Sequence, residues 1–257
     1  MLTFDLNCDL GEYEDTNAAW HDAKIMDYIS SCNIACGGHA GNQHIIKQTV
    51  TLALEKQVSI GAHPSFPDRD NFGRSEMQLP AYELKEIIRT QILNVKTAAE
   101  TQGGKLSHVK PHGALYNQAA NDLALAQLLA ETIAELDKKL FFYGLAHSAM
   151  ATACQQCGVN FVAEGFVDRA YQTNGMLVPR SHPGAVISDV HELVKRAIGI
   201  IKNQSVISIE GDVTQLVINS LCIHGDHENA TQTAQLLQEG LLLAGIVIKA
   251  PQLYQKL

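Results

Sequence analysis

The sequence predicts an α/β fold, a distorted seven-stranded (β/α) barrel that forms one domain over residues 1–257. Short apolar runs alternate with longer stretches of helical period, as in parallel strands joined by crossover helices. Polar segments containing Gly or Pro follow most of the apolar runs, as βα loops do at the carboxyl edge of a parallel sheet. An open, doubly wound sheet gives the same alternation and is the alternative architecture.

Each predicted strand is a short, mostly apolar run. In chain order the strands are Thr3–Asn7, Cys32–Ala35, Val58–Ala62, Leu106–Lys110, Leu140–Gly144, Asn160–Glu164 and Ser220–His224. The stretches between them carry apolar residues three and four positions apart, which is the core-facing stripe of a helix. The runs Val206–Glu210 and Gln215–Asn219 flank Gly211-Asp212 and predict a β-hairpin inserted before the last strand.

The composition narrows the range of functions. With 46% hydrophobic and 18% charged residues, the chain has enough apolar side chains for a large core. Its formal net charge of −8 is the wrong sign for a nucleic-acid or anionic-membrane surface, so we expect neither partner. The sequence shows no signal peptide and no apolar run long enough to cross a bilayer, which favours the cytoplasm and six free cysteine thiols.

Three polar triplets predict the active site. Residues two apart on a strand point to the same side, so the members of each triplet lie together. The triplets are Asp5, Asn7 and Asp9; His108, Lys110 and His112; and Cys222, His224 and Asp226. Because buried charges are costly unless they are paired or used, ionisable groups that converge at one end of a barrel indicate a catalytic site.

A second group of candidates follows the sixth predicted strand. Glu164 and Asp168 are carboxylates that could act as acid or base, and Arg169 or Arg180 could hold a carboxylate or phosphoryl group in a two-point contact. Asp9, His39 and His63 are ligands of the kind that bind Zn²⁺ or Mn²⁺, so a divalent metal is a further candidate, although no compact metal motif such as His-Glu-x-x-His is present.

Two common catalytic motifs are missing from the sequence. Gly103-Gly104-Lys105 resembles the end of a phosphate loop but lacks the earlier Gly and the following Ser or Thr. We therefore expect ATP to be bound and hydrolysed elsewhere. No Gly-x-Ser-x-Gly elbow is present, which argues against a serine hydrolase.

Read in order, the polar segments resemble the LamB/YcsF family over nearly the whole chain. They are Asp5–Glu12, Asn33–Gly41, Gly61–Pro64, Phe72–Arg74, Val109–Asn117, Asp168–Tyr171 with Pro179-Arg180 and Pro183–Ala185, and Cys222–Asp226. The resemblance implies a barrel of the glycoside hydrolase/deacetylase type. It also implies opening of the lactam ring of 5-oxo-L-proline to L-glutamate, coupled to ATP hydrolysis, with ATP bound mainly by partner subunits B and C of 5-oxoprolinase.

Within this scheme the water-activating set is Asp9 with His63 or His112, and Lys110 is the cation that stabilises the developing oxyanion. Glu164 and Asp168 remain catalytic candidates. The residues assigned to substrate binding are Asn7, His39, Arg74, Arg169, Tyr171, Arg180, His224 and Asp226.

The chain departs from the family pattern at three positions, where Gly38, Asn42 and Ser75 replace the usual Phe, Asp and Arg. These changes put in doubt a role for the loop around residue 42 and a paired-Arg anion site. Two other functions stay open: a metal-dependent deacetylase or amidase that acts alone, and a non-catalytic subunit that binds the substrate. Association of identical chains is also left open.

Overall fold

The strands close into a barrel. The computed structural model describes residues 1–14, 19–223 and 229–253. Its wall consists of β1 (Leu2–Leu10), β2 (Ser31–Ala35), β3 (Ser59–His63), β4 (Leu106–Val109), β5 (Phe141–Leu145), β6 (Asn160–Phe166) and β9 (Ser220–Ile223). These strands pair in parallel in this order, and β9 pairs with β1, with Asp5 opposite Ser220. The closed ring confirms the barrel prediction and excludes the open sheet.

The first strand is longer than the sequence predicts. Cys8, Asp9 and Leu10 continue the pairing with β2, so Asp9 lies within the strand rather than in the loop after it. At its other end, Leu2–Phe4 pairs in parallel with β10 (Ile246–Ile248), a strand that was not predicted from the sequence. β1 therefore has two neighbours on one side, β10 along its first residues and β9 along the next ones.

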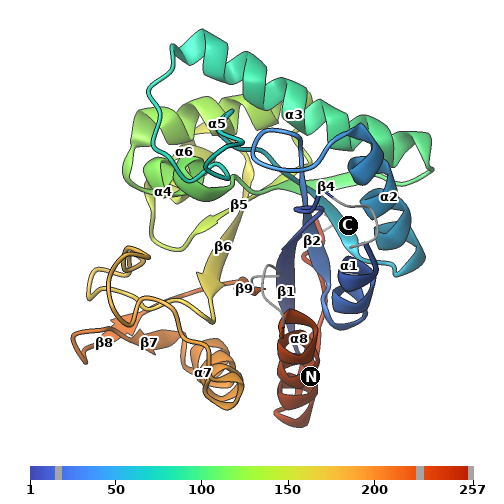
Figure 1. The fold of residues 1–257 in the computed structure, drawn as a ribbon. Helices are drawn as coiled ribbons and strands as arrows, with labels where there is room; N and C mark the ends of the chain where they lie inside the picture. Colours follow the sequence, from blue (N-terminus) through green and yellow to red (C-terminus); the bar gives the residue numbers. More distant parts are fainter. Residues whose placement is uncertain (15–18, 224–228, 254–257) are drawn as a thin grey trace.

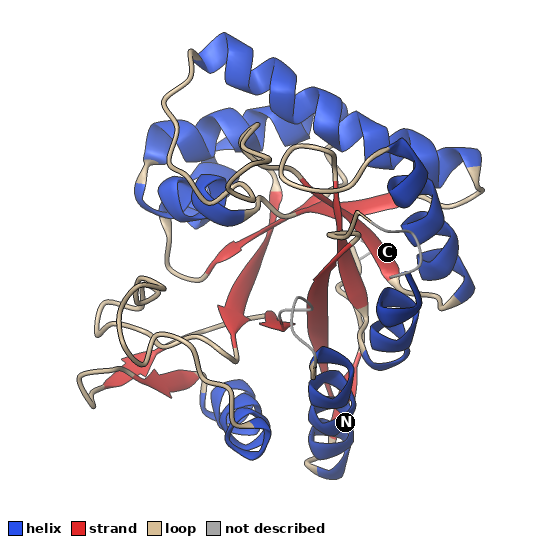
Figure 2. Cartoon of the chain, viewed as in Figure 1, coloured by secondary structure: helices blue, strands red, loops and turns tan. Residues whose placement is uncertain are grey.

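Helices pack around the outside of the wall (Figures 1 and 2). They are α1 (Ala19–Ile25), the 3-10 turn η2 (Met26–Tyr28), α2 (Gln43–Glu55), α3 (Ala81–Thr101), α4 (Gly113–Asn121), α5 (Leu123–Leu136), α6 (Ala149–Cys157), α7 (Val190–Asn203) and α8 (Ala230–Leu243). The predicted stripes face the core, as buried Leu84, Ile88 and Ile92 of α3 illustrate. Within the described ranges, no helix is long and apolar enough to span a membrane.

Side-chain caps fix where three of the helices begin. Asn42, Asp122 and Asp189 each accept hydrogen bonds from the backbone N–H groups two and three residues ahead. Such caps satisfy N–H groups that have no partner inside the helix. Asn42, one of the departures from the family pattern, therefore serves as the N-cap of α2.

The predicted hairpin is present, but its strands are shorter than expected, and the second lies at Val213–Gln215 rather than at Gln215–Asn219. β7 (Ser205–Ile207) and β8 (Val213–Gln215) form an antiparallel pair between α7 and β9. Pairing stops at Ile207 because the chain then turns: the Ser208 N–H donates to the Asp212 carbonyl, and Gly211 has a φ of 94°. In Figure 1 the hairpin lies beside α7, away from the other helices.

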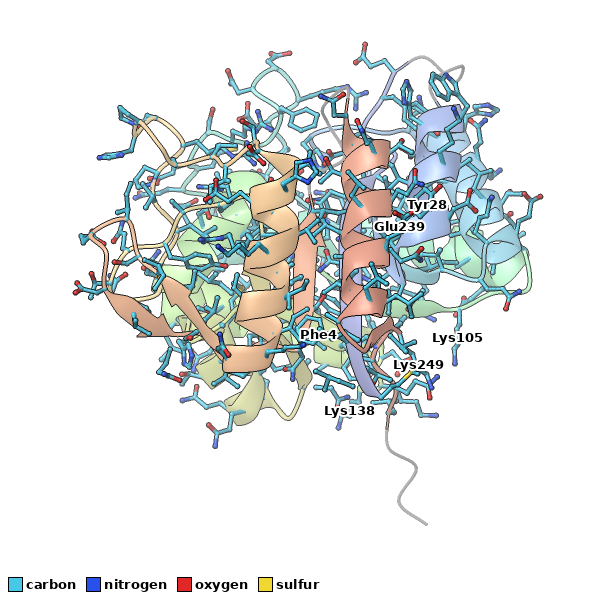
Figure 3. All side chains as sticks on the ribbon, turned by 90° about the horizontal axis from the view of Figure 1, so that it is seen from below. Phe4, Tyr28, Lys105, Lys138, Glu239 and Lys249 are labelled. Atoms are coloured by element: carbon cyan, nitrogen blue, oxygen red, sulfur yellow. The ribbon has the colours of Figure 1, made fainter. Side chains whose placement is uncertain are left out.

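The amino-terminal end of the barrel carries several lysines. Lys105 and Lys138 come shortly before β4 and β5, and the Lys249 N–H donates to the Phe4 carbonyl at 2.8 Å. Figure 3 labels these residues in a view turned by 90° from that of Figure 1. Gly103-Gly104-Lys105 immediately precedes β4, so this phosphate-loop-like segment lies at the end of the strands opposite to His63 and Lys110.

Candidate active site

The barrel interior is polar along one side of β1. Asp5, Asn7 and Asp9 are all buried and point inward, as the alternation of the strand predicts. Asp5 accepts hydrogen bonds from Ser31 at 2.7 Å and Tyr143 at 3.0 Å, and also from Ser30 and Ser220. Burial raises the pKa of Asp5 in spite of these hydrogen bonds, which lower it. Asp5 is thus enclosed at the bottom of the site.

Lys110 lies at the centre of the interior. Its Nζ atom is 2.9 Å from Asp9 Oδ1, 3.0 Å from Glu164 Oε1 and 3.0 Å from Cys222 Sγ. Burial alone would lower the pKa of this ammonium, but the interactions with Asp9, Cys222 and Glu164 outweigh it and raise the pKa well above its ordinary value. Lys110 is therefore a fixed cation between two carboxylates.

A second layer of hydrogen bonds holds Asp9 and Glu164. The Asn33 amide donates to Asp9 Oδ1 at 2.7 Å, and the Tyr116 hydroxyl donates to Glu164 Oε2 at 2.8 Å. The side-chain oxygen of the same amide, Asn33 Oδ1, accepts from His108 Nε2 at 2.8 Å. The ring of His108 fits because Gly61 faces it: a Cβ at Gly61 would overlap with His108 Nε2.

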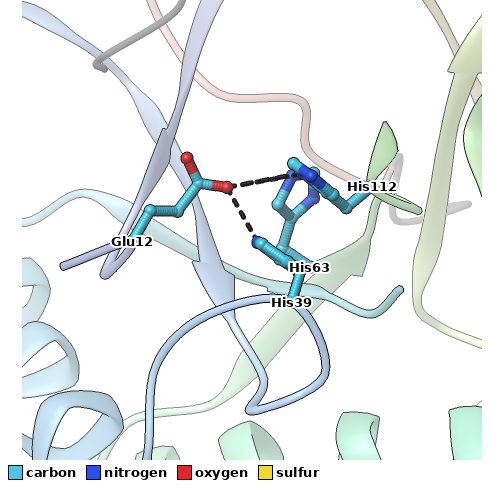
Figure 4. A group of neighbouring side chains, drawn as sticks. All are labelled: Glu12, His39, His63 and His112. Carbon is cyan, nitrogen blue, oxygen red and sulfur yellow. Dashed lines mark hydrogen bonds and ion pairs between the residues drawn. The ribbon is translucent and has the colours of Figure 1, made fainter. Parts of the chain in front are cut away.

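Three histidines and one glutamate gather above this layer (Figure 4). His39 follows β2, His63 ends β3, His112 precedes α4 and Glu12 follows β1. One ligand atom from each of the four lies within 4.8 Å of the others, so these three buried histidines and the half-buried Glu12 could hold a metal ion. Asp9 stands beside the cluster, with Oδ2 3.3 Å from His63 Nε2.

Backbone carbonyls fix the orientation of two of the rings. His63 Nδ1 lies 2.7 Å from the Lys110 carbonyl, and His112 Nε2 lies 2.9 Å from the Phe72 carbonyl. A carbonyl oxygen only accepts, so each of these ring nitrogens carries the hydrogen. The remaining nitrogens, His63 Nε2 and His112 Nδ1, face each other at 2.9 Å.

The surroundings keep two of the histidines neutral. Burial lowers the pKa of His39 to about 2, and the neighbouring His63 contributes the second-largest effect in the same direction. Burial and the nearby His63 and His39 lower the pKa of His112 well below its ordinary value. A neutral imidazole offers a nitrogen lone pair to a metal or a proton, whereas an imidazolium does not.

A cavity of about 780 Å³ opens above these groups. The predicted site residues that line it, together with Glu12, are Asp9, His63, Arg74, Lys110, His112, Arg169 and Arg180. Arg169 donates to the Val178 carbonyl at 2.6 Å, and burial and the nearby Arg180 lower its pKa. The cavity thus combines a carboxylate and histidine cluster with an arc of arginines.

The other predicted residues lie behind the lining or outside the described part. Asn7 and Glu164 are buried and bonded to each other at 2.9 Å, and His39 is buried in the histidine cluster. The Tyr171 hydroxyl contacts the Phe166 N–H at 2.6 Å, so this side chain braces the loop after β6. Asp168 precedes Arg169 in the same loop. His224 and Asp226 lie outside the described residues.

Two parts of this site were not singled out from the sequence. Glu12 was visible as the next charged residue after Asp9, but it lies beyond the strand, where alternation no longer predicts direction. The Phe72 carbonyl is presented by consecutive left-handed residues, Phe72 and Gly73, with φ of 55° and 64°. In the sequence, the only available signal was the Phe72-Gly73 pair itself. The positive φ of Phe72 is visible only in the structure; such a φ is uncommon for a residue other than Gly and concentrates at functional sites.

Fold and cavity together define an α/β barrel whose ionisable groups gather at the carboxyl ends of its strands, as in barrel enzymes. The chain belongs to the LamB/YcsF family, whose model matches residues 4–256. The resemblance seen in the sequence is thereby confirmed.

Two relatives and one structure of the same fold illustrate the similarity. The A subunit of 5-oxoprolinase from Shouchella clausii (strain KSM-K16) is 43% identical over 250 residues, covering 97% of this chain and 99% of the relative. The crystal structure of a lactam utilization protein from Thermus thermophilus matches with a TM-score of 0.91 and 36% identity, over 97% of this chain and all 100% of that one. A deacetylase solved with substrate shares the fold, with a TM-score of 0.51 and 14% identity over 96% of this chain and 86% of the deacetylase.

Proposed function

We propose that this chain is the A subunit of an ATP-dependent 5-oxoprolinase and that it forms a single domain. It would add water to the carbonyl carbon of 5-oxo-L-proline and open the lactam to L-glutamate, together with partner subunits B and C. The observation that carries the proposal is the full-length similarity to the A subunit of a 5-oxoprolinase, 43% identity over 97% of this chain and 99% of the relative.

Asp9 is the best placed general base for water. It lines the cavity, and its Oδ2 atom lies 3.3 Å from His63 Nε2, while its Oδ1 atom lies 2.9 Å from Lys110 Nζ. The ammonium favours the ionised carboxylate, and one oxygen remains directed towards the histidines. His63 or His112 would then carry the proton to the amide nitrogen that leaves when the ring opens.

Lys110 supplies positive charge at the floor of the cavity. An ammonium held by Asp9 and Glu164 stays in place during the reaction, so it would stabilise the oxyanion that develops on the carbonyl oxygen. Asn7 and Glu164 orient it from behind the lining. We assign these two residues to positioning rather than to direct contact with substrate.

The arginines would bind the anionic part of the substrate. Arg74, Arg169 and Arg180 line one cavity, and guanidinium groups hold carboxylates or phosphoryl groups in two-point contacts. The loop 168–171, which includes Asp168 and Tyr171, would position Arg169. ATP would bind mainly on the partner subunits, since Gly103-Gly104-Lys105 lies at the far end of the barrel.

A reconstitution assay tests the proposal. The chain would be purified alone and with its B and C partners from the native host, and glutamate release from 5-oxoproline would be measured with and without ATP. We expect turnover only in the complete, ATP-supplied mixture. Absence of glutamate from the complete mixture would contradict the proposed function.

The histidine cluster favours a second candidate, a metal-dependent deacetylase or amidase that acts alone. That enzyme would turn over an acylated substrate without partners or ATP and would lose activity with a chelator. The Asp9→Asn variant distinguishes both enzymes from a non-catalytic subunit that binds substrate. If the chain only binds substrate, this variant would leave the activity of the complex unchanged.

A further inference from the structure

We propose that Glu12, His39, His63 and His112 form a binding site for one divalent transition-metal ion, with zinc as the ion that fits this ligand set best. The site lies in the same cavity as the proposed reaction, but binding of the ion does not depend on which substrate that cavity takes. The set differs from the one expected from the sequence, because Glu12 and His112 join His39 and His63 while Asp9 stands beside them.

The ligand atoms are already spaced for a metal. His112 Nδ1 and His63 Nε2 are 2.9 Å apart, and Glu12 Oε1 lies 2.9 Å from His39 Nε2, 3.4 Å from His112 Nδ1 and 3.9 Å from His63 Nε2. Tetrahedral zinc with bonds of about 2.0–2.1 Å to N and O places its ligand atoms roughly 3.4 Å from one another. The observed distances lie on both sides of this value.

The contact between His63 and His112 calls for a positive charge. Each ring gives its hydrogen to a backbone carbonyl, so the two nitrogens that face each other at 2.9 Å both present lone pairs. Two lone pairs at this distance repel unless an additional proton or a metal cation lies between them. Glu12, and Asp9 at its side, add negative charge on the same side of the rings, which suits a divalent ion better than an empty site.

The hydrogen bonds behind the rings are those of metal-binding histidines. A ligating imidazole usually donates its other N–H to a carbonyl or carboxylate, which fixes the ring and makes the ligating nitrogen a better donor. His63 and His112 do this through the carbonyls of Lys110 and Phe72. A Cβ at Gly73 would lie 2.9 Å from His39 Cβ and 3.0 Å from His112 Cδ2, so the loop that presents the Phe72 carbonyl packs directly on the cluster.

The donor set also selects the kind of ion. Three imidazole nitrogens and one carboxylate suit zinc and its first-row neighbours, whereas Mg²⁺ and Ca²⁺ prefer oxygen ligands. When bound, such an ion would polarise a carbonyl oxygen or acidify a water molecule in the cavity. Four residues of this chain would then hold the ion. Because His63 and His112 would both be ligands, Asp9 would take up the proton and, in their place, deliver it to the amide nitrogen that leaves.

Metal content and a cobalt spectrum test the site without any substrate. The purified full-length chain would be stripped with a chelator, loaded with Zn²⁺ or Co²⁺, dialysed, and analysed by elemental mass spectrometry and visible absorption. The variants are Glu12→Gln and His112→Gln, with His191→Gln as the control, because His191 is exposed on α7. Thermal unfolding of each variant would verify its fold.

We expect about one metal ion per chain in the wild type and in His191→Gln, at least a tenfold weaker affinity in both cluster variants, and cobalt absorption bands typical of low coordination number. Metal retained equally by all four proteins would overturn the site, as would a wild-type chain that holds none. If a cluster variant fails to fold, the cobalt spectrum of the wild type decides between these outcomes. Glutamate release is measured separately, so a failed 5-oxoprolinase assay and a failed metal site are told apart.

Discussion

The Lys110 ammonium lies 2.9 Å from the Asp9 carboxylate, and both groups are buried inside the barrel. A second carboxylate, Glu164, lies 3.0 Å from the same Nζ atom. Because the pair joins β1 to the end of β4 across the interior, it serves the fold as well as the site. Substitutions here are therefore expected to change stability and activity together.

Lys110→Met should abolish glutamate release by the complex and also destabilise the chain. Methionine fills the volume but leaves Asp9 and Glu164 as buried carboxylates without their counter-charge, a loss of about 3–5 kcal/mol in comparable buried pairs. Urea unfolding and the reconstituted assay measure the two effects. Lys105→Met, at the opposite end of β4, is the control and should change neither; an active, equally stable Lys110→Met would exclude the role assigned to the ammonium.

Gly61→Ala should destabilise the barrel by about 1–3 kcal/mol, because the added methyl would overlap with His108 Nε2 and must displace a buried ring. Gly199→Ala in α7 is a matched control, since its Cβ would meet nothing within 4 Å. That variant should gain about 0.5–1 kcal/mol from the better helix propensity of Ala. Equal effects of the two substitutions on the unfolding midpoint would contradict the close packing of His108.

Asp22→Asn should flatten the pH dependence of stability. Burial raises the pKa of Asp22 to about 7, against the hydrogen bond from the Gly11 N–H. Because the pKa of this carboxyl is higher in the folded chain than its unfolded value near 4, its contribution to stability is fully present below pH 4. The contribution is lost as the pH rises towards 7, at about 1.4 kcal/mol per pH unit. Asn keeps an acceptor for Gly11 without the charge, so its advantage over Asp should be larger at pH 8 than at pH 5.

Thermal unfolding of the wild type and of Asp22→Asn at pH 5 and pH 8 checks the sign of this change in stability. Because the other ionisable groups are common to both chains, the difference between the two melting temperatures isolates residue 22. A difference that does not change with pH would mean that Asp22 does not titrate in this range.

Arg180→Ala should raise the KM for 5-oxoproline about tenfold with a smaller change in kcat, since loss of one charge-assisted contact to a carboxylate costs on the order of 1.4 kcal/mol. Arg89→Ala, on the outer helix α3, is the control. Steady-state kinetics of the reconstituted complex separate the two constants. An unchanged KM would remove Arg180 from the substrate site.

Strand alternation accounts for most of what the sequence predicts of the site. Because the side-chain period of a strand is two, alternation placed Asp5, Asn7 and Asp9 on one side of a strand, and it placed Lys110 at a strand end. The strand β10 was not predicted, since three apolar residues after a helix give too short a pattern. Glu12 was also missed as a member of the histidine cluster.

Other parts of the site depend on tertiary contacts that no local pattern carries. Tyr116 lies on the buried face of α4 and is indistinguishable in sequence from a core aromatic, although its hydroxyl reaches Glu164 at 2.8 Å. The Phe72 carbonyl depends on backbone direction rather than residue type. Such contacts join residues far apart in the chain and form only once the barrel is closed.

The closure of β9 onto β1 has a consequence for biosynthesis. The Asp5 and Ser220 side chains hydrogen-bond across 215 positions of sequence, and Lys110 meets Cys222 across 112. During translation, β1 emerges first but cannot acquire its neighbour β9 until the final strand of the ring has left the ribosome. Until then β1 and β6 both present open sheet edges, which are sites of mispairing and aggregation. The polar interior is therefore completed among the last steps of synthesis, and a chain that stops before residue 220 would keep both of these edges open.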